Sequence, residues 1–128
     1  MADVVVDASA LVDLLLGNRL GAEVARRLSD ERLHAPAHLD VEVLSALGRL
    51  HRGAHLTEEQ VETMLASLRA APIVRHEPAD LVRGAWARRD RVRLVDAVYL
   101  ELADRLDAPL VTTDLRLRHE AHVDAIGA

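Results

Sequence analysis

The sequence predicts an α/β fold, with a central and mainly parallel sheet flanked by helices. Short runs rich in β-branched residues, such as Val4-Val5-Val6, alternate with longer segments whose apolar residues recur at helical spacing. Strands separated by helices favour parallel pairing, because each return helix covers a face of the sheet. A length of 128 residues fits a single domain, 1–128, with one core.

The first half of the chain alternates short strands with amphipathic helices. The predicted segments are a strand at 2–6, a helix holding residues 11–16 and closing at Gly17, a helix at 21–29, a strand at 33–35 stopping at Pro36, and a long helix from 39 to Gly53. Gly17, Pro36 and Gly53 commonly end regular structure, and they mark the ends of three of these segments.

The second half repeats the alternation. Its segments are a helix opened by the capping box Thr57–Gln60, a minimal strand at 73–74, a helix from Pro78 through Trp86, a helix at 96–106, a strand at 110–113, a short helical turn and a last strand near 122–124.

Composition excludes several classes of chemistry. Cysteine is absent, which removes thiolate nucleophiles and disulfides, and lysine is absent, which removes P-loop and Schiff-base chemistry. A net charge of −5 does not favour binding nucleic acid by bulk electrostatics. The start of the chain lacks the pattern of a secretory signal, and the longest apolar stretch is too short to span a bilayer, so we expect a cytoplasmic protein without a membrane segment.

Four acidic residues are the candidate site. Asp7 ends the first strand and Asp114 follows the strand at 110–113, so both belong at the carboxyl edge of a parallel sheet, where such folds bind ligands. Glu42 lies at the margin of the apolar face of its helix, and Asp96 opens an apolar helix. Each is flanked by residues expected to be buried, which is unusual for a carboxylate.

A divalent cation would compensate carboxylates gathered in this way. Mg²⁺ prefers oxygen ligands, polarises phosphoryl oxygens and activates bound water. Taken singly, each acid has a simpler interpretation: Asp96 as a helix N-cap, Glu42 as a solvated helix residue, and the nearby Asp40 as compensation for the helix dipole. Their joint placement favours a shared site.

The chain resembles PIN-domain ribonucleases, and in particular the VapC toxins of type II toxin–antitoxin systems. The matching segments, in family order, are 4–11, 40–47, 95–103 and 109–114. The resemblance implies a PIN-like three-layer sandwich in which Asp7, Glu42, Asp96 and Asp114 are catalytic. Asp7 and Asp96 would bind Mg²⁺ or Mn²⁺, Glu42 and Asp114 would do so directly or through water, and Ser9 and Thr112 would order the site.

The resemblance also implies partners. They are an RNA substrate, a cognate VapB-like antitoxin in a hetero-oligomer, and a second copy of the chain in a homodimer. A dense basic run of Arg88, Arg89, Arg91 and Arg93 is either a solvated helix end or a rim that contacts RNA phosphates. Trp86 and Tyr99 are expected in the core rather than against bases, and the histidine spacings do not indicate zinc.

Two alternatives remain open beside a metal-dependent endoribonuclease. One is a related small metal-dependent phosphatase or nuclease, whose 5′-nuclease form normally needs an arch-like insertion that this chain is too short to hold. The other is a catalytically silent PIN-like module that binds or regulates, which would require a broken set of acids.

Overall fold

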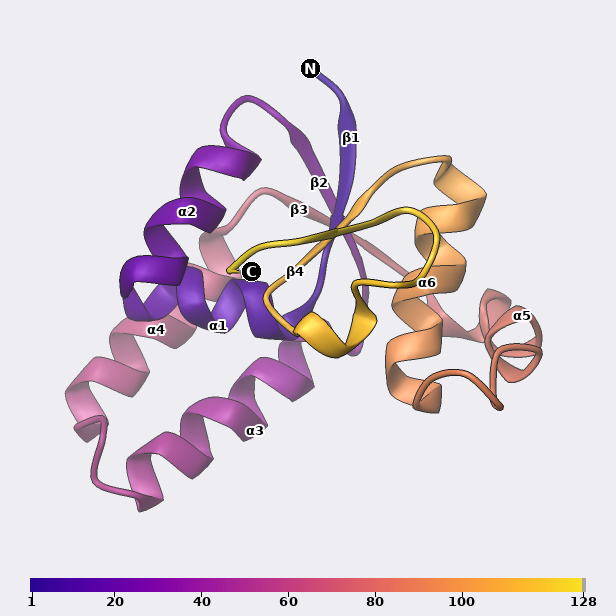
Figure 1. Ribbon diagram of the computed structural model, residues 1–128. Helices are drawn as coiled ribbons and strands as arrows, with labels where there is room; N and C mark the ends of the chain where they lie inside the picture. Colours follow the sequence, from indigo (N-terminus) through magenta and orange to yellow (C-terminus); the bar gives the residue numbers. More distant parts are fainter. Residues whose placement is uncertain (128) are drawn as a thin grey trace.

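The computed structural model describes residues 1–127, which form three layers (Figure 1). The one residue of the predicted domain 1–128 outside this range is Ala128. The sheet is five-stranded and all parallel, in the order β3-β2-β1-β4-β5, which confirms the predicted fold class. Its strands are β1 (Asp3–Val6), β2 (Arg32–Pro36), β3 (Ile73–His76), β4 (Leu110–Thr112) and β5 (Val123–Ala125).

Helices cover both faces of this sheet. One group is α1 (Ala8–Leu16), α2 (Arg19–Leu28), α3 (Leu39–Arg52) and α4 (Glu58–Ala70), and the other is α5 (Val82–Trp86) and α6 (Leu94–Leu106). Figure 1 shows the two groups on opposite sides of the strands. Two short 3-10 turns, η1 (Pro78–Asp80) and η2 (Leu115–Leu117), complete the described elements.

The chain reverses its direction of travel across the sheet at β1. It runs from β1 outward to β2 and β3, then crosses through α5 and α6 to β4 on the other side of β1. The carboxyl ends of β1 and β4 therefore flank a topological switch point, which is the place where parallel α/β sheets form crevices.

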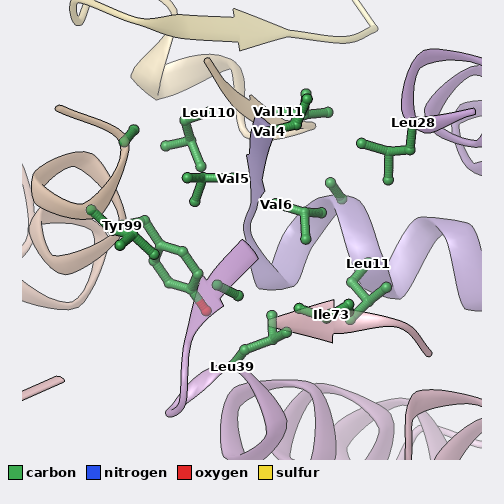
Figure 2. Packing of buried hydrophobic residues seen from close by; sticks show 14 of the residues in the cluster. Val4, Val5, Val6, Leu11, Leu28, Leu39, Ile73, Tyr99, Leu110 and Val111 are labelled. Carbon is green, nitrogen blue, oxygen red and sulfur yellow. The ribbon is translucent and has the colours of Figure 1, made fainter. Parts of the chain in front are cut away.

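The core forms because alternate side chains of β1 enter opposite layers. In Figure 2, Val5 faces Tyr99 of α6, whereas Val6 lies on the side of Leu11 in α1. Val4, Val5 and Val6 have no exposed surface. Each fully buried aliphatic side chain of this size contributes about 1.5–3 kcal/mol by leaving water.

Helix ends follow the chemistry of their capping residues. Thr57 and Gln60 form the predicted capping box at α4, each side chain accepting a hydrogen bond from the other residue's backbone N–H. Gly17 ends α1 in the left-handed conformation (φ 66°), which glycine adopts without steric cost.

Two predictions for the segment around Trp86 are wrong. The expected helix from Pro78 through Trp86 is broken at Leu81 into η1 and α5. Trp86 is not in the core, because its side chain lies at the end of α5, 57 % exposed, beneath the guanidinium of Arg89. Tyr99 is buried as expected.

Candidate active site

The four predicted acids line a single cleft of about 360 Å³ at the carboxyl edge of the sheet. Asp7 follows β1 and Asp114 follows β4, while Glu42 and Asp96 lie in the first turns of α3 and α6. Parallel strands bring their carboxyl ends to one edge, and the positive ends of helix dipoles favour acids in first turns. Four segments far apart in sequence thus place carboxylates along one cleft.

Asp7 is held at the base of the cleft by short hydrogen bonds. Its side chain is the N-cap of α1, accepting from the Ala10 N–H at 3.0 Å. It also accepts from the Ser9 hydroxyl at 2.8 Å and from Thr112. Among residues 1–127, Asp7 and Thr112 are the two buried polar side chains, and they satisfy one another.

The same hydroxyl groups also hold the end of β4. The backbone N–H of Asp114 donates to Thr112 Oγ1 at 2.9 Å, and that of Thr113 donates to Ser9 Oγ at 3.2 Å. Ser9 and Thr112 therefore fix Asp7 and the backbone that carries Asp114, which is the contact that an ordering role requires.

Burial makes Asp7 costly to ionise. It raises the pKa of the Asp7 carboxyl to about 6, outweighing the hydrogen bonds from Thr112, Ala10 and Ser9. The negative charge of Asp96 raises the pKa of Asp7 further, so these two carboxylates repel one another. A cation between them would relieve both the desolvation and the repulsion.

Glu42 is positioned from α6. Tyr99 donates its hydroxyl to Glu42 Oε1 at 2.6 Å, and His38 Nε2 lies 3.2 Å from the same oxygen. Burial raises the pKa of Glu42, but contact with His38 and Tyr99 outweighs burial and leaves the pKa lowered. Burial and Glu42 both raise the pKa of Tyr99, so its hydroxyl remains a donor.

Asp96 and Asp114 each carry a bidentate arginine partner. Arg93 donates to the two oxygens of Asp96 at 3.0 and 3.3 Å, and Arg116 donates to the two oxygens of Asp114 at 2.9 and 2.6 Å. Asp96 is the third residue of α6, whose N-cap is Arg93, so the N-cap interpretation of Asp96 is wrong.

The four arginines of the basic run make different contacts. Arg93 lines the cleft, whereas Arg88 pairs with Glu101 and Arg91 pairs with Glu120. Arg89 lies over the Trp86 ring at 4.8 Å. Asp40, the alternative acid of α3, forms a bidentate pair with Arg75.

The cleft is also lined by three charged residues that were not predicted from the sequence: Asp13, Arg49 and Arg116. Arg49 follows Glu42 by seven positions, two helical turns, so the shared face of α3 was a usable signal. Thr113 donates to Asp13 at 2.7 Å, a contact between α1 and the end of β4 that no local pattern encodes.

The donor set fits a hard cation, although the acids are not gathered around one point. In residues 1–127, no group of three or more His, Cys, Asp or Glu side chains is arranged to hold a metal ion, and two of the four acids face arginines instead. The cleft nevertheless offers carboxylate oxygens from four segments, the ligands that Mg²⁺ prefers.

The all-parallel sheet and its acidic cleft define an α/β protein with a polar site at the switch point. The PIN domain model matches residues 4–123, and the chain belongs to that family. It is 53 % identical over 116 residues to Ribonuclease VapC3 of Mycobacterium tuberculosis, covering 89 % of this chain and 84 % of the relative.

Solved structures share the fold at low sequence identity. VapC20 of Mycobacterium tuberculosis, described as a toxin that cleaves the sarcin–ricin loop, aligns with a TM-score of 0.65 at 18 % identity, over 86 % of this chain and 87 % of that one. A toxin–antitoxin complex from Klebsiella pneumoniae aligns with a TM-score of 0.61 at 16 % identity, over 95 % and 96 % of the two chains. None of the helices in residues 1–127 has the length and apolarity needed to cross a membrane.

Proposed function

We propose that this chain is a metal-dependent endoribonuclease toxin that hydrolyses RNA phosphodiester bonds and is neutralised by a VapB-like antitoxin. The observation that carries the proposal is the convergence of Asp7, Glu42, Asp96 and Asp114 in one cleft. The names of its relatives, ribonucleases of the VapC group, support RNA as the substrate.

In this proposal Asp7 and Asp96 hold Mg²⁺ directly, and Glu42 and Asp114 bind it directly or through water, with Mn²⁺ able to substitute. The metal, when bound, lowers the pKa of a coordinated water and polarises a phosphoryl oxygen. Ser9 and Thr112 keep the Asp7 oxygens oriented, and Tyr99 keeps Glu42 directed into the cleft. The chain's own task is thus to fix carboxylates and present phosphate-binding groups around them.

RNA recognition is proposed for the arginines near the cleft. Arg93 is the member of the predicted set Arg88, Arg89, Arg91 and Arg93 that lines it. A guanidinium fork matches phosphate oxygens in a bidentate manner, so Arg93 can orient the substrate strand. Contact of RNA with the other three stays a prediction.

We also propose that the toxin forms a homodimer, and a hetero-oligomer with its antitoxin. Exposed apolar side chains on α5 and at the start of α6 support self-association; they are Val82, Trp86, Leu94 and Val95. The structure from Klebsiella pneumoniae that shares this fold is a complex of toxin with antitoxin, which supports the second partner.

The decisive experiment is RNA cleavage by antitoxin-free protein in Mg²⁺ or Mn²⁺. We expect EDTA to abolish cleavage, and Asp7→Asn or Asp96→Asn to lower the rate by roughly 100-fold or more. Asp30→Asn is the matched control, because Asp30 is exposed and precedes β2 at the opposite edge of the sheet.

Each alternative gives a different result. Cleavage that survives both EDTA and the two substitutions would rule out the metal–carboxylate site. Metal-loaded wild type that cleaves no RNA but hydrolyses a phosphate monoester would favour the phosphatase, and inactivity on both would favour a silent binding module.

A further inference from the structure

Arg93, Asp96, Asp114 and Arg116 form one four-charge cluster at the mouth of the cleft. Arg93 and Asp96 belong to the start of α6, and Asp114 and Arg116 belong to the turn η2. All four side chains line the same cleft, which brings the two ion pairs together in one place.

The two aspartates of the cluster are buried more deeply than the two arginines. The Asp96 and Asp114 side chains are 13 % and 17 % exposed, whereas those of Arg93 and Arg116 are 64 % and 70 % exposed. The carboxylates thus lie within the cleft and the guanidinium groups lie over them. A ligand that enters from solvent meets the arginines first.

These ion pairs do little for the fold. Each joins residues only two or three positions apart, so neither ties distant segments together. Pairs whose guanidinium group is largely exposed contribute little to stability, because water and salt screen that charge. Arg75 is a contrast, since it connects β3 to Asp40 of α3 across 35 positions and also donates to the Leu68 carbonyl of α4.

The arginines occupy the same oxygen atoms that a metal ion would need. Arg116 uses both oxygens of Asp114, and Arg93 uses both oxygens of Asp96. A cation and a guanidinium cannot share those oxygens in the same geometry. Released arginines retain a planar fork of donors that suits phosphate as well as carboxylate.

We infer that Arg116, acting with Arg93, pairs with the acids of the metal-free protein and becomes a phosphate clamp for RNA once a divalent cation binds Asp114 and Asp96. This inference rests on the proposed function. Arg116 then has two opposed effects: it weakens metal binding and strengthens RNA binding. A purely structural arginine would have neither effect.

The effect of Arg116 on metal binding is tested by titrating the metal-free, antitoxin-free protein with Mn²⁺ and measuring free Mn²⁺ by electron paramagnetic resonance. Removing a competing positive charge in Arg116→Gln should tighten Mn²⁺ binding by roughly three- to tenfold. Arg116→Lys keeps the charge and should remain close to wild type. Arg118→Gln is the matched control, since Arg118 is exposed beside the same turn and donates to the Leu115 carbonyl.

RNA binding is measured in Mg²⁺ with a fluorescent 20-nucleotide single-stranded RNA whose phosphorothioate linkages keep the charge and resist hydrolysis, and every variant keeps Asp7 so that the metal site is intact. Arg116→Gln should weaken binding and reduce the slope of log affinity against log salt by about 0.7, the value for one lost phosphate contact on a single strand. Arg116→Lys should bind RNA less tightly than arginine, because it lacks the fork. Arg118→Gln should match wild type.

Opposite changes in the two affinities, found in Arg116→Gln and absent from Arg118→Gln, would support the inference. Unchanged Mn²⁺ affinity in Arg116→Gln overturns it when wild type binds Mn²⁺, and so does unchanged RNA affinity. Failure of wild type and Arg116→Gln alike to bind Mn²⁺ overturns the metal centre of the proposed function as well, so the two failures are distinguishable.

Discussion

Tyr99 of α6 donates its hydroxyl to Glu42 of α3 across 2.6 Å, joining helices from the two outer layers at the wall of the cleft. The rest of the Tyr99 ring is buried against the β1 side of the core (Figure 2). The Tyr99 side chain therefore both packs in the core and holds the Glu42 carboxylate in position. A substitution that shifts the packing of α6 should for this reason also shift Glu42.

Replacing this tyrosine separates its two tasks. Tyr99→Phe keeps the ring but removes the donor, so the free energy of unfolding should fall by only about 1 kcal/mol. The pKa of Glu42 should rise, because a contact that lowers it is lost. Carboxyl NMR titration of the metal-free protein measures the second effect, and an unchanged Glu42 titration would contradict the positioning role.

Asp7 should make the metal-free protein less stable as the pH rises. Its pKa is about 6 in the folded chain and 3.8 without the fold, so the folded state binds the extra proton between these values. Stability is lost as Asp7 ionises on going from about pH 4 to 6, by about 3 kcal/mol. Urea unfolding in EDTA should show this loss in wild type and not in Asp7→Asn; parallel pH profiles would refute it.

Two glycines should respond to alanine with opposite signs. A Cβ at Gly21 of α2 would overlap the Asp13 carbonyl of α1, so Gly21→Ala should cost about 1–3 kcal/mol by forcing the helices apart. At Gly48 of α3 the nearest atom would be 3.6 Å away, on the flexible Arg52 side chain, so Gly48→Ala should stabilise by about 0.5–1 kcal/mol. Thermal unfolding measures the change in Tm of each variant. Equal changes in Tm would show that close packing of α1 against α2 does not determine the effect at Gly21.

The exposed Trp86 should report on self-association. Trp86→Arg places a charge within the apolar surface of α5 and α6, so a wild-type dimer should dissociate to monomers in sedimentation experiments. Val74→Arg on the edge strand β3 is the control, because Val74 is also exposed but lies outside that surface. A monomeric wild type would count against the homodimer, and a dimeric Trp86→Arg would place the contact elsewhere.

The parts of the site that follow from strand direction were predictable. Asp7 and Asp114 each come after an apolar run, and the carboxyl ends of parallel strands meet at one edge. The helix acids were harder to judge, since Glu42 and Asp96 have local explanations that only the tertiary arrangement can test. Asp96 illustrates this, because its position three residues into α6 removes the capping role and leaves it facing the cleft.

Side-chain partners and surface exposure were less predictable. Arg116 pairs with Asp114 through the local bend of η2, a turn too short to show a periodic signal. Trp86 was expected inside because large aromatic residues usually are, yet α5 is a single short helix whose inner face is occupied by Ala85. The close fit of Gly84 against the Glu101 carboxylate sets where α5 lies, and neither residue indicates it alone.

The hydrogen bond between Asp7 and Thr112 spans 105 residues, nearly the whole distance from the first strand to the fourth. During synthesis, Asp7 leaves the ribosome long before its partner is translated, and β1 lacks the neighbour β4 that completes one side of the switch point. The nascent polypeptide therefore carries Asp7, Glu42 and Asp96 before Asp114 exists, and a cleft lined by all four acids forms only after β4 has been synthesised.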